Sequence, residues 1–281
     1  MATTKKSSDI TEQDYVDFFE KADKRISDLL RKMLDKIGSG AESASVKYLR
    51  KYKIQVRKIL SDLKHDSAEW ADVAIPMFYD SGVSAADGQL GSAGYSINMD
   101  FGRLHPRSIT VLVEAMKARG EDVLSVIGRR VDDVYRAVQL DAAASSVMGY
   151  ETVRKAARKL RSDLLENGVT RFVDKGGKSW HMGTYSEMAA RTVTMEARMK
   201  GQFNELIAYG EDLVQVSSHP LSCPKCEPFQ GRILSISGDT PGYTTVAAAK
   251  AAGLWHPNCR HSAALYVPGI SGQEDTHDKH G

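Results

Sequence analysis

The sequence predicts an α+β protein in which a mainly α-helical N-terminal region is followed by a small mixed α+β C-terminal domain. Two observations predict the helical part and its end: apolar residues recur every three or four positions up to about residue 168, and short alternating segments with glycine turns follow. A third observation marks the C-terminal part, because all three cysteines lie between positions 223 and 259. With 281 residues, 42% of them hydrophobic, the chain can bury a core without disulfide bonds.

The first 168 residues are predicted to form a helical bundle or arm. One apolar stripe runs from Tyr15 to Ile37 and ends at glycine, and a second runs from Val46 to Leu63. Helical spacing resumes at about residue 109, and a further helix is expected over about 150–165. Residues 81–106 are rich in glycine and serine and lack periodicity, so we expect a long loop there.

Residues 169–270 are predicted to form the small α+β domain. Side chains alternate over 170–182 around Gly176-Gly177, which predicts a β-hairpin, and a helix is expected to begin near Tyr185. Short strands are expected at 213–216, 233–234 and 264–267, with a small helix at 244–252. Residues 271–281 are polar, and we expect them to form a disordered tail.

The charges are balanced over the whole chain but not locally. The net charge of +2 excludes a uniformly basic nucleic-acid-binding protein, so any such role needs a local patch. The segment from Glu42 to Lys64 holds seven bases against two acids, and a second basic run lies at 154–161. Such a face can follow a phosphate backbone or an acidic protein surface, although a solvated helix face is the simpler explanation. The candidate contacts for DNA or a protein partner are Lys47, Arg50, Lys51, Arg57, Lys58, Arg154, Lys155, Arg158, Lys159 and Arg161.

Cysteines and histidines gather between positions 219 and 261 in a pattern typical of a zinc knuckle. Cys223 and Cys226 form a C-x-x-C pair, and an H-x-x-C-x-H cluster begins thirty residues after Cys226. A tetrahedral zinc site takes four ligands, which usually arrive as two closely spaced pairs from two turns. The predicted zinc ligands are therefore Cys223, Cys226, His256 and Cys259, with His261 and His219 as spare candidates.

The number of protein ligands decides what such a metal can do. Four protein ligands make a structural site that stabilises a small domain, whereas three leave an open position at which hydrolysis is possible. A metal-free knuckle and a thiol redox motif are the alternatives, but the redox motif does not account for the histidines. The odd number of cysteines favours a reducing compartment, and the absence of a signal peptide or an apolar span predicts synthesis in the cytoplasm.

Several separate motifs follow one another in order over about residues 168–269. They are the hairpin with Trp180, Arg191-Thr192 in the next helix, Gly210 before a strand, Cys223-Pro224-Lys225-Cys226, and His256-Pro257-Asn258-Cys259-Arg260-His261. Together they resemble the phage minor capsid protein 2 family and, more distantly, the Mu-type F head-morphogenesis proteins. In the Mu-type relatives the last position of the final motif is commonly cysteine; this chain has His261 there, which can also bind zinc.

The resemblance implies a structural virion protein and no enzyme: a minor capsid and head-morphogenesis protein, associated with the portal. Its place is then the capsid interior or the portal vertex, after assembly in the host cytoplasm. Its expected partners are the portal protein, the major capsid protein or both, and packaged double-stranded DNA, with no membrane and no small-molecule substrate. The alternatives are a zinc-supported nuclease, which metal-dependent nicking of a plasmid would reveal, and a plain DNA-binding protein, whose affinity falls steeply with salt.

Overall fold

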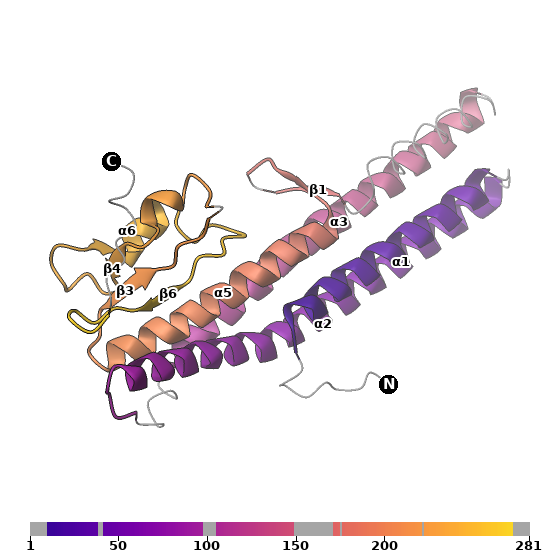
Figure 1. The fold of residues 1–281 in the computed structure, drawn as a ribbon. Coiled ribbons are helices and arrows are strands. Elements are labelled where there is room, and N and C mark those ends of the chain that lie inside the picture. Colours follow the sequence, from indigo (N-terminus) through magenta and orange to yellow (C-terminus); the bar gives the residue numbers. More distant parts are fainter. Residues whose placement is uncertain are drawn as a thin grey trace. The chain divides into compact units, whose positions relative to one another are not determined.

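The computed structural model describes residues 10–38, 42–97, 105–148, 171–174, 176–220 and 222–271 of the 281-residue chain. For residues 34–38, 42–49, 133–148 and 172 only the backbone is described. The helices are α1 (Glu12–Gly38), α2 (Glu42–Ser92), α3 (Pro106–Met148), α5 (Met182–Ala208) and α6 (Val246–Ala251), with a 3₁₀ turn η3 (Glu227–Phe229) (Figure 1). The strands are β1 (Phe172–Val173), β2 (Ser179–Trp180), β3 (Leu213–Val216), β4 (Ile233–Ser235), β5 (Thr244–Thr245) and β6 (Ala263–Leu265).

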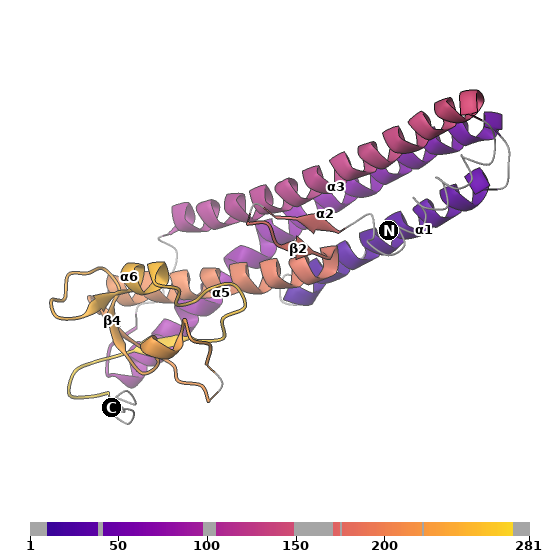
Figure 2. The ribbon, with the colours of Figure 1, turned by 90° about the horizontal axis from the view of Figure 1, so that it is seen from above.

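The predicted α+β class is confirmed. Long helices make up the N-terminal part, and a four-stranded sheet in the order β5-β4-β3-β6 follows α5. Strand β3 pairs antiparallel with β4 and β6, whereas β4 pairs parallel with β5, so the sheet is mixed. The predicted hairpin is also present, with β1 antiparallel to β2 and Phe172 opposite Trp180. Figure 2 shows β4 and α6 gathered beside α5.

The predicted loop over residues 81–106 is wrong in its first part, because α2 continues as a helix to Ser92. Val83, Ala86 and Leu90 are all buried and follow one another at helical spacing, so this stretch has an apolar face. The glycines and serines between them disfavour helices, so the sequence pattern did not predict this face. Pro76 lies inside α2 and does not end it. Residues 98–104 of the predicted loop are outside the described ranges.

Contacts divide the chain into two compact units, each assembled from separate stretches of sequence. The helical unit consists of the described parts of residues 11–71 and 115–187, and the sheet unit of Ile10 and the described parts of 72–114 and 188–281. The domain boundary that the sequence predicts near residue 168 lies in 149–170, outside the described residues, as do the helix expected at 150–165 and the tail after residue 271.

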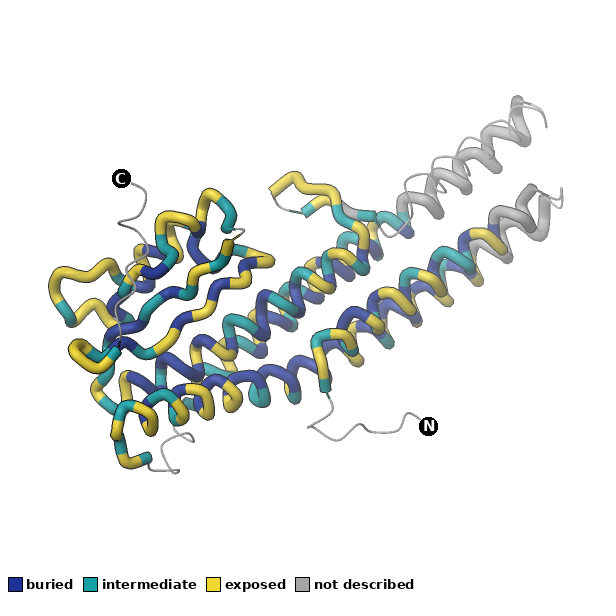
Figure 3. Tube along the Cα trace, viewed as in Figure 1, coloured by how far each residue is buried: buried dark blue, intermediate teal, exposed yellow. Residues whose placement is uncertain are grey.

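The helical unit has an aromatic core at the start of α1. The Tyr15 ring lies 4.8 Å from those of both Phe19 and Trp70, measured between centroids, and all three side chains are buried. The indole nitrogen of Trp70 donates a 2.9 Å hydrogen bond to the carbonyl of Thr11, which ties α2 to the residue before α1. Figure 3 shows the buried positions of α1 and α2 recurring along each helix, as the predicted stripes require.

The sheet unit buries one face of its sheet against α5. Phe203 and Leu206 of α5 share an apolar cluster with Val214, Val216 and Leu234 of the sheet. Two glutamines connect this cluster to α2. The side-chain amide of Gln202 donates to the side-chain oxygen of Gln89 at 3.1 Å and to the Ala263 carbonyl at 2.9 Å, and Gln89 also accepts from the Leu265 amide at 2.8 Å.

Candidate metal centre

The first half of the site is a tight turn at Cys223. The amides of Cys226 and Glu227 both donate to the Cys223 carbonyl, at 3.0 and 2.9 Å, and the 3₁₀ turn η3 follows at once. The turn comes shortly after β3, so the sheet positions it. This geometry brings the sulfurs of Cys223 and Cys226 within 4.8 Å of each other.

The second half is the turn that follows α6. Trp255 and Asn258 have positive φ angles of 56° and 68°, which non-glycine residues rarely adopt, and the Cys259 amide donates to the His256 carbonyl at 2.8 Å. Left-handed residues on both sides of His256 bend the chain sharply before β6. The bend directs His256 and Cys259 toward the Cys223 turn, as the distances below show. Holding these two conformations costs about 1–3 kcal/mol each, which other interactions at the site must offset.

Five ligand atoms come together between the two turns. Cys223 Sγ lies 3.0 Å from His256 Nε2, Cys226 Sγ lies 3.5 Å from Cys259 Sγ, and Cys259 Sγ lies 3.4 Å from His261 Nδ1. Bonds of about 2.3 Å to sulfur and 2.0 Å to nitrogen place tetrahedral ligands about 3.8 Å apart for two sulfurs and about 3.5 Å apart for sulfur and nitrogen. The observed separations are therefore close to the edges of a zinc tetrahedron.

The five atoms form two overlapping groups, each with all members within 4.8 Å of one another. Cys223, Cys226 and His256 make one group, and Cys226, Cys259 and His261 make the other. Every predicted ligand, and the spare candidate His261, thus belongs to a group that could hold a metal ion. The other spare candidate, His219, belongs to neither group: its Nε2 lies 3.1 Å from the Ser217 hydroxyl and 3.2 Å from the Arg260 carbonyl.

Backbone amides surround the sulfurs. The His261 amide donates to Cys259 Sγ at 3.4 Å, and the Trp255 amide donates to Cys226. The turn at Trp255 thus places an amide donor beside the Cys226 thiol. The hydrogen bond from the Cys226 amide outweighs the opposing effect of burial and, with His256, lowers the pKa of Cys223 to about 7. Burial, in contrast, raises the pKa of Cys226 to about 12, and a bound cation would favour its thiolate form.

Oxygen atoms hold the outer nitrogen of each histidine. His256 Nδ1 lies 2.8 Å from the Pro257 carbonyl, and His261 Nε2 lies 3.3 Å from Oε1 of Gln230. A proton on the outer nitrogen leaves the inner nitrogen, which faces a sulfur, free to bind a metal. Burial lowers the pKa of His261, with added repulsion from His219 and His256, and this keeps its ring neutral. Sequence reasoning missed Gln230, because a glutamine has no motif that marks it as a partner of a ligand.

The basic candidates on α2 differ in their ion pairs. Arg50 and Lys51 are exposed. Arg57 bonds to Asp132 of α3 at 3.2 Å, together with its neighbour Lys53 at 2.9 Å. Lys58 bonds to Asp62 at 3.1 Å. Lys47 is in α2 at a position where only the backbone is described, and Arg154, Lys155, Arg158, Lys159 and Arg161 lie outside the described residues.

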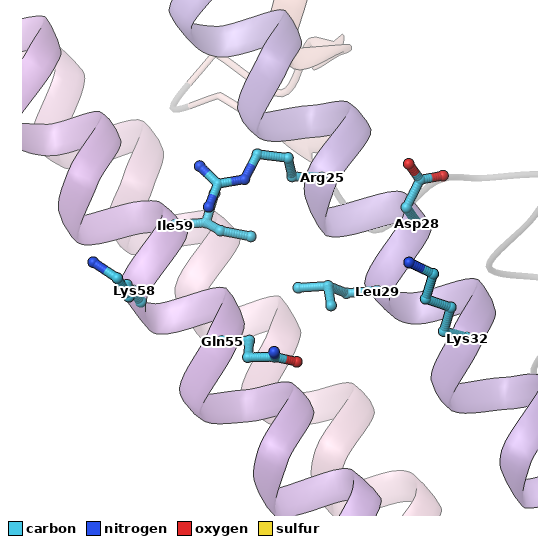
Figure 4. A pocket seen from close by; sticks show the side chains of 7 residues that line it. All are labelled: Arg25, Asp28, Leu29, Lys32, Gln55, Lys58 and Ile59. Atoms are coloured by element: carbon cyan, nitrogen blue, oxygen red, sulfur yellow. The ribbon is translucent and has the colours of Figure 1, made fainter. Parts of the chain in front are cut away.

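Helix α1 adds cations that sequence reasoning missed. A surface hollow of about 320 Å³ lies between α1 and α2 and is called the basic groove below (Figure 4). In Figure 4, Arg25 extends from α1 toward Ile59 of α2, and Leu29 also lies between the two helices. Three cations and one acid line the groove; its residues are Arg25, Asp28, Leu29, Lys32, Gln55, Lys58 and Ile59. The charges of α1 are mixed along the sequence, so nothing there singled out Arg25 or Lys32.

Comparison with known proteins connects this fold to phage structural proteins. The family model described as phage minor capsid protein 2 matches residues 6–280. A stretch of 153 residues is 26% identical to a protein named "Structural protein" from Lactococcus phage LL-H, and it covers 51% of this chain and 41% of that relative. This chain thus corresponds to about two fifths of the relative's length. No solved structure matches the chain significantly.

None of the described helices is both long enough and apolar enough to cross a bilayer.

The resemblance inferred from the hairpin and the Cys/His motifs is confirmed by the family match, which extends well beyond those motifs into the N-terminal helices. The chain belongs to the phage minor capsid protein 2 family.

Proposed function

We propose that this protein is a structural component of a phage head, in which a zinc ion clamps the small sheet unit. The proposed ligands are Cys223, Cys226, Cys259 and His256, in a closed site without catalytic function. The single observation that carries the zinc clamp is the pair of Cys/His groups that share Cys226, and the family match carries the place in a phage head. The partners that fit a minor capsid protein are the portal protein, the major capsid protein or both, within the capsid or at the portal vertex.

A bound metal ion would stabilise the sheet unit by holding its two cysteine-bearing turns in place. The four strands of the sheet are two to four residues long, and the turns that carry the cysteines make few backbone bonds to it. Strands this short form few interstrand hydrogen bonds. Cys226 and Cys259 are buried in the apolar cluster, so an ion bound there would join both turns to the core. Cysteine and histidine ligands are the set that zinc prefers.

One tetrahedral ion can take only four of the five available atoms. Two of the possible sets of four use all three thiolates and add either His256 or His261. Backbone amides donate to each of these three sulfurs and favour the thiolate form. We assign the fourth position to His256, since it comes from the same turn as Cys259 and matches the paired delivery of zinc ligands. His261 then packs against the site as a buried neutral ring held by Gln230.

The experiment is a metal analysis of the purified full-length protein and its variants. We expect about one zinc per chain in the wild type. Cys226→Ser and Cys259→Ser should lose the metal and lower the melting temperature by about 10 °C or more. His256→Ala should weaken zinc binding more than His261→Ala does. His219→Ala is the matched control, because His219 is nearby but belongs to neither group, and it should keep its zinc.

Two results would contradict the zinc clamp. One is a wild-type protein without metal that is as stable as a zinc-treated sample. The other is a loss of zinc from His219→Ala as large as that from His256→Ala. The same preparations test the nuclease alternative: incubated with supercoiled plasmid, with and without a chelator, they should cause no metal-dependent nicking.

DNA contact is a second proposed role, favoured by the basic groove. Arg25 and Lys32 of α1 add to the exposed Arg50 and Lys51 of α2, so two helices of the helical unit contribute cations. Packaged DNA presents a dense array of phosphates, to which such a surface can bind without reading sequence. This contact does not depend on zinc, because the groove belongs to the helical unit and the cysteines to the sheet unit.

A further inference from the structure

We propose that Cys226 and Cys259 form a disulfide bond when the metal is absent and a thiol oxidant such as glutathione disulfide is present, and that the oxidant enters through Cys223. The cysteines are those of the proposed zinc clamp. The inference rests on that clamp in one respect only, namely that a bound ion should protect the thiols. It is carried by the relative positions of the three sulfurs.

Cys226 and Cys259 are already in contact. Their sulfurs lie 3.5 Å apart, and a disulfide needs about 2.05 Å, so the two turns have to approach by roughly 1.5 Å. Cys226 is the member shared by both ligand groups, with Cys223 in one group and Cys259 in the other. Cys223 Sγ lies 3.0 Å from His256 Nε2 and also interacts with the Cys226 thiol.

The surroundings favour the same pair. Cys226 and Cys259 are buried in the apolar cluster with Leu254 and Trp255, whereas Cys223 is only partly buried. An uncharged disulfide suits an apolar site and is shielded there from reducing thiols. The bond between Cys226 and Cys259 also closes a loop over 33 positions. A long loop removes more conformational entropy from the unfolded chain than the short C-x-x-C loop does.

Exchange through Cys223 explains how an oxidant reaches two buried thiols. The Cys223 thiolate attacks glutathione disulfide, which forms a mixed disulfide and releases one glutathione. Cys226, within 4.8 Å, then attacks the Cys223 sulfur and displaces the second glutathione. Cys259 finally attacks Cys226 and sets Cys223 free. In total, two protein thiols lose two electrons and two protons, and one glutathione disulfide becomes two glutathione thiols.

The positions of lysine and arginine make the product directly readable. Trypsin cleaves after Lys and Arg, so the three cysteines fall in separate peptides: 201–225, 226–232 and 251–260. The full-length protein is treated with a chelator, incubated with glutathione disulfide, alkylated, digested and analysed by mass spectrometry. A zinc-loaded sample is treated in parallel.

We expect peptides 226–232 and 251–260 to be linked at equilibrium, with Cys223 alkylated. Early samples should show Cys223 bound to glutathione or to Cys226. Cys223→Ser should reach the same link several-fold more slowly, and Cys226→Ser should form only glutathione adducts. Zinc loading should slow the reaction by about tenfold or more, because bound thiolates are not free to attack.

A final link between Cys223 and Cys226 in the wild type, or glutathione adducts alone, would overturn the proposal. The zinc clamp is tested separately by the same samples. If the link between Cys226 and Cys259 forms equally fast with zinc, the disulfide proposal holds and the protective ion is wrong. If zinc protects but the final link joins Cys223 to Cys226, the clamp holds and the disulfide proposal fails.

Discussion

The carbonyl oxygen of Arg198 on α5 occupies the space where a side chain on Gly82 of α2 would begin. A β-carbon placed on Gly82 would lie 1.9 Å from that oxygen, and one placed on Gly201 would lie 2.1 Å from the Tyr79 carbonyl. Each helix thus places a glycine against the backbone of the other. Within the sheet unit, the backbones of α2 and α5 touch at this point because neither glycine has a side chain.

Replacing either glycine should therefore weaken the sheet unit. Gly82→Ala and Gly201→Ala each force two backbones apart, and we expect a loss of about 2–3 kcal/mol in the free energy of unfolding. Gly88→Ala is the matched control: Gly88 is also in α2, nothing lies within 4 Å of its β-position, and alanine should stabilise the helix by about 0.5–1 kcal/mol. Denaturant unfolding of the three variants checks this, and equal effects at Gly82 and Gly88 would contradict the close contact.

The same glycines explain where sequence reasoning failed on the fold. The stripe of α1 was predictable because Phe19, Ile26 and Leu30 are long apolar residues at helical spacing, and all are buried. Gly82 and Gly88 indicate a loop when they are read locally, since glycine disfavours helices. Only the presence of α5, more than a hundred residues away, turns Gly82 into a packing residue. Such a contact has no local signal.

The candidate site shows the same limit. Cysteine and histidine spacing was enough to predict that these side chains gather in groups that could hold a metal ion, because two short pairs are a local pattern. The left-handed backbone at Trp255, directly before His256, could not be predicted, because no residue type in the sequence indicates it. The basic run on α2 shows the same limit: Arg57 bonds to Asp132, 75 positions along the chain, and the local charge balance does not include that partner.

Asp212 should stabilise the loop after β4. Its carboxylate accepts hydrogen bonds of 2.6 Å from the Ser235 and Thr240 hydroxyls, and of 2.7 Å from both the amide and the hydroxyl of Ser237. Asp212→Asn loses acceptor capacity and charge, so we expect about 2 kcal/mol less stability at pH 7. Asp239→Asn, at an exposed position of the same loop, is the control and should have little effect.

The effect of Asp212 should depend on pH. Burial alone would raise the pKa of Asp212, but its hydrogen bonds outweigh burial and lower the pKa well below its usual range. A carboxyl with a lowered pKa stabilises the folded state above the unfolded pKa of about 3.9, and this stability is lost as the pH falls further. The difference between wild type and Asp212→Asn should therefore be constant from pH 7 to about pH 5 and shrink toward pH 3. Denaturant unfolding at each pH measures it; a constant difference down to pH 3 would rule out this account.

The pKa of Glu205 is shifted in the opposite direction to that of Asp212, so its effect on stability depends on pH in the opposite way. Its side chain is buried on α5, and its Oε2 has no hydrogen-bond partner among the described residues; the same holds for Oδ1 of Asp87 on α2. Burial, followed by repulsion from Asp87, raises the pKa of Glu205. The wild type should thus lose stability as the pH rises from about 4.5 through the raised pKa. Glu205→Gln avoids the buried charge and should be more stable than wild type by about 1 kcal/mol at pH 8, but not at pH 4.5. Thermal unfolding at the two pH values decides, and a variant that is less stable at pH 8 contradicts the argument.

If the proposed DNA contact exists, Arg25 and Arg57 should contribute differently to DNA binding although they carry the same charge. Arg25 lines the basic groove, whereas Arg57 is already paired with Asp132, which it shares with Lys53. A cation that binds a phosphate releases a counterion, so each such contact adds about 0.9 to the slope of log affinity against log salt. Arg25→Gln should therefore weaken binding to a short DNA duplex several-fold at low salt and reduce the slope by about one.

Arg57→Gln, the matched exchange, should leave the slope unchanged. Fluorescence anisotropy over a salt series measures both. Equal slopes for the two variants would mean that the groove has no special role and that only the overall charge of the helical unit attracts DNA.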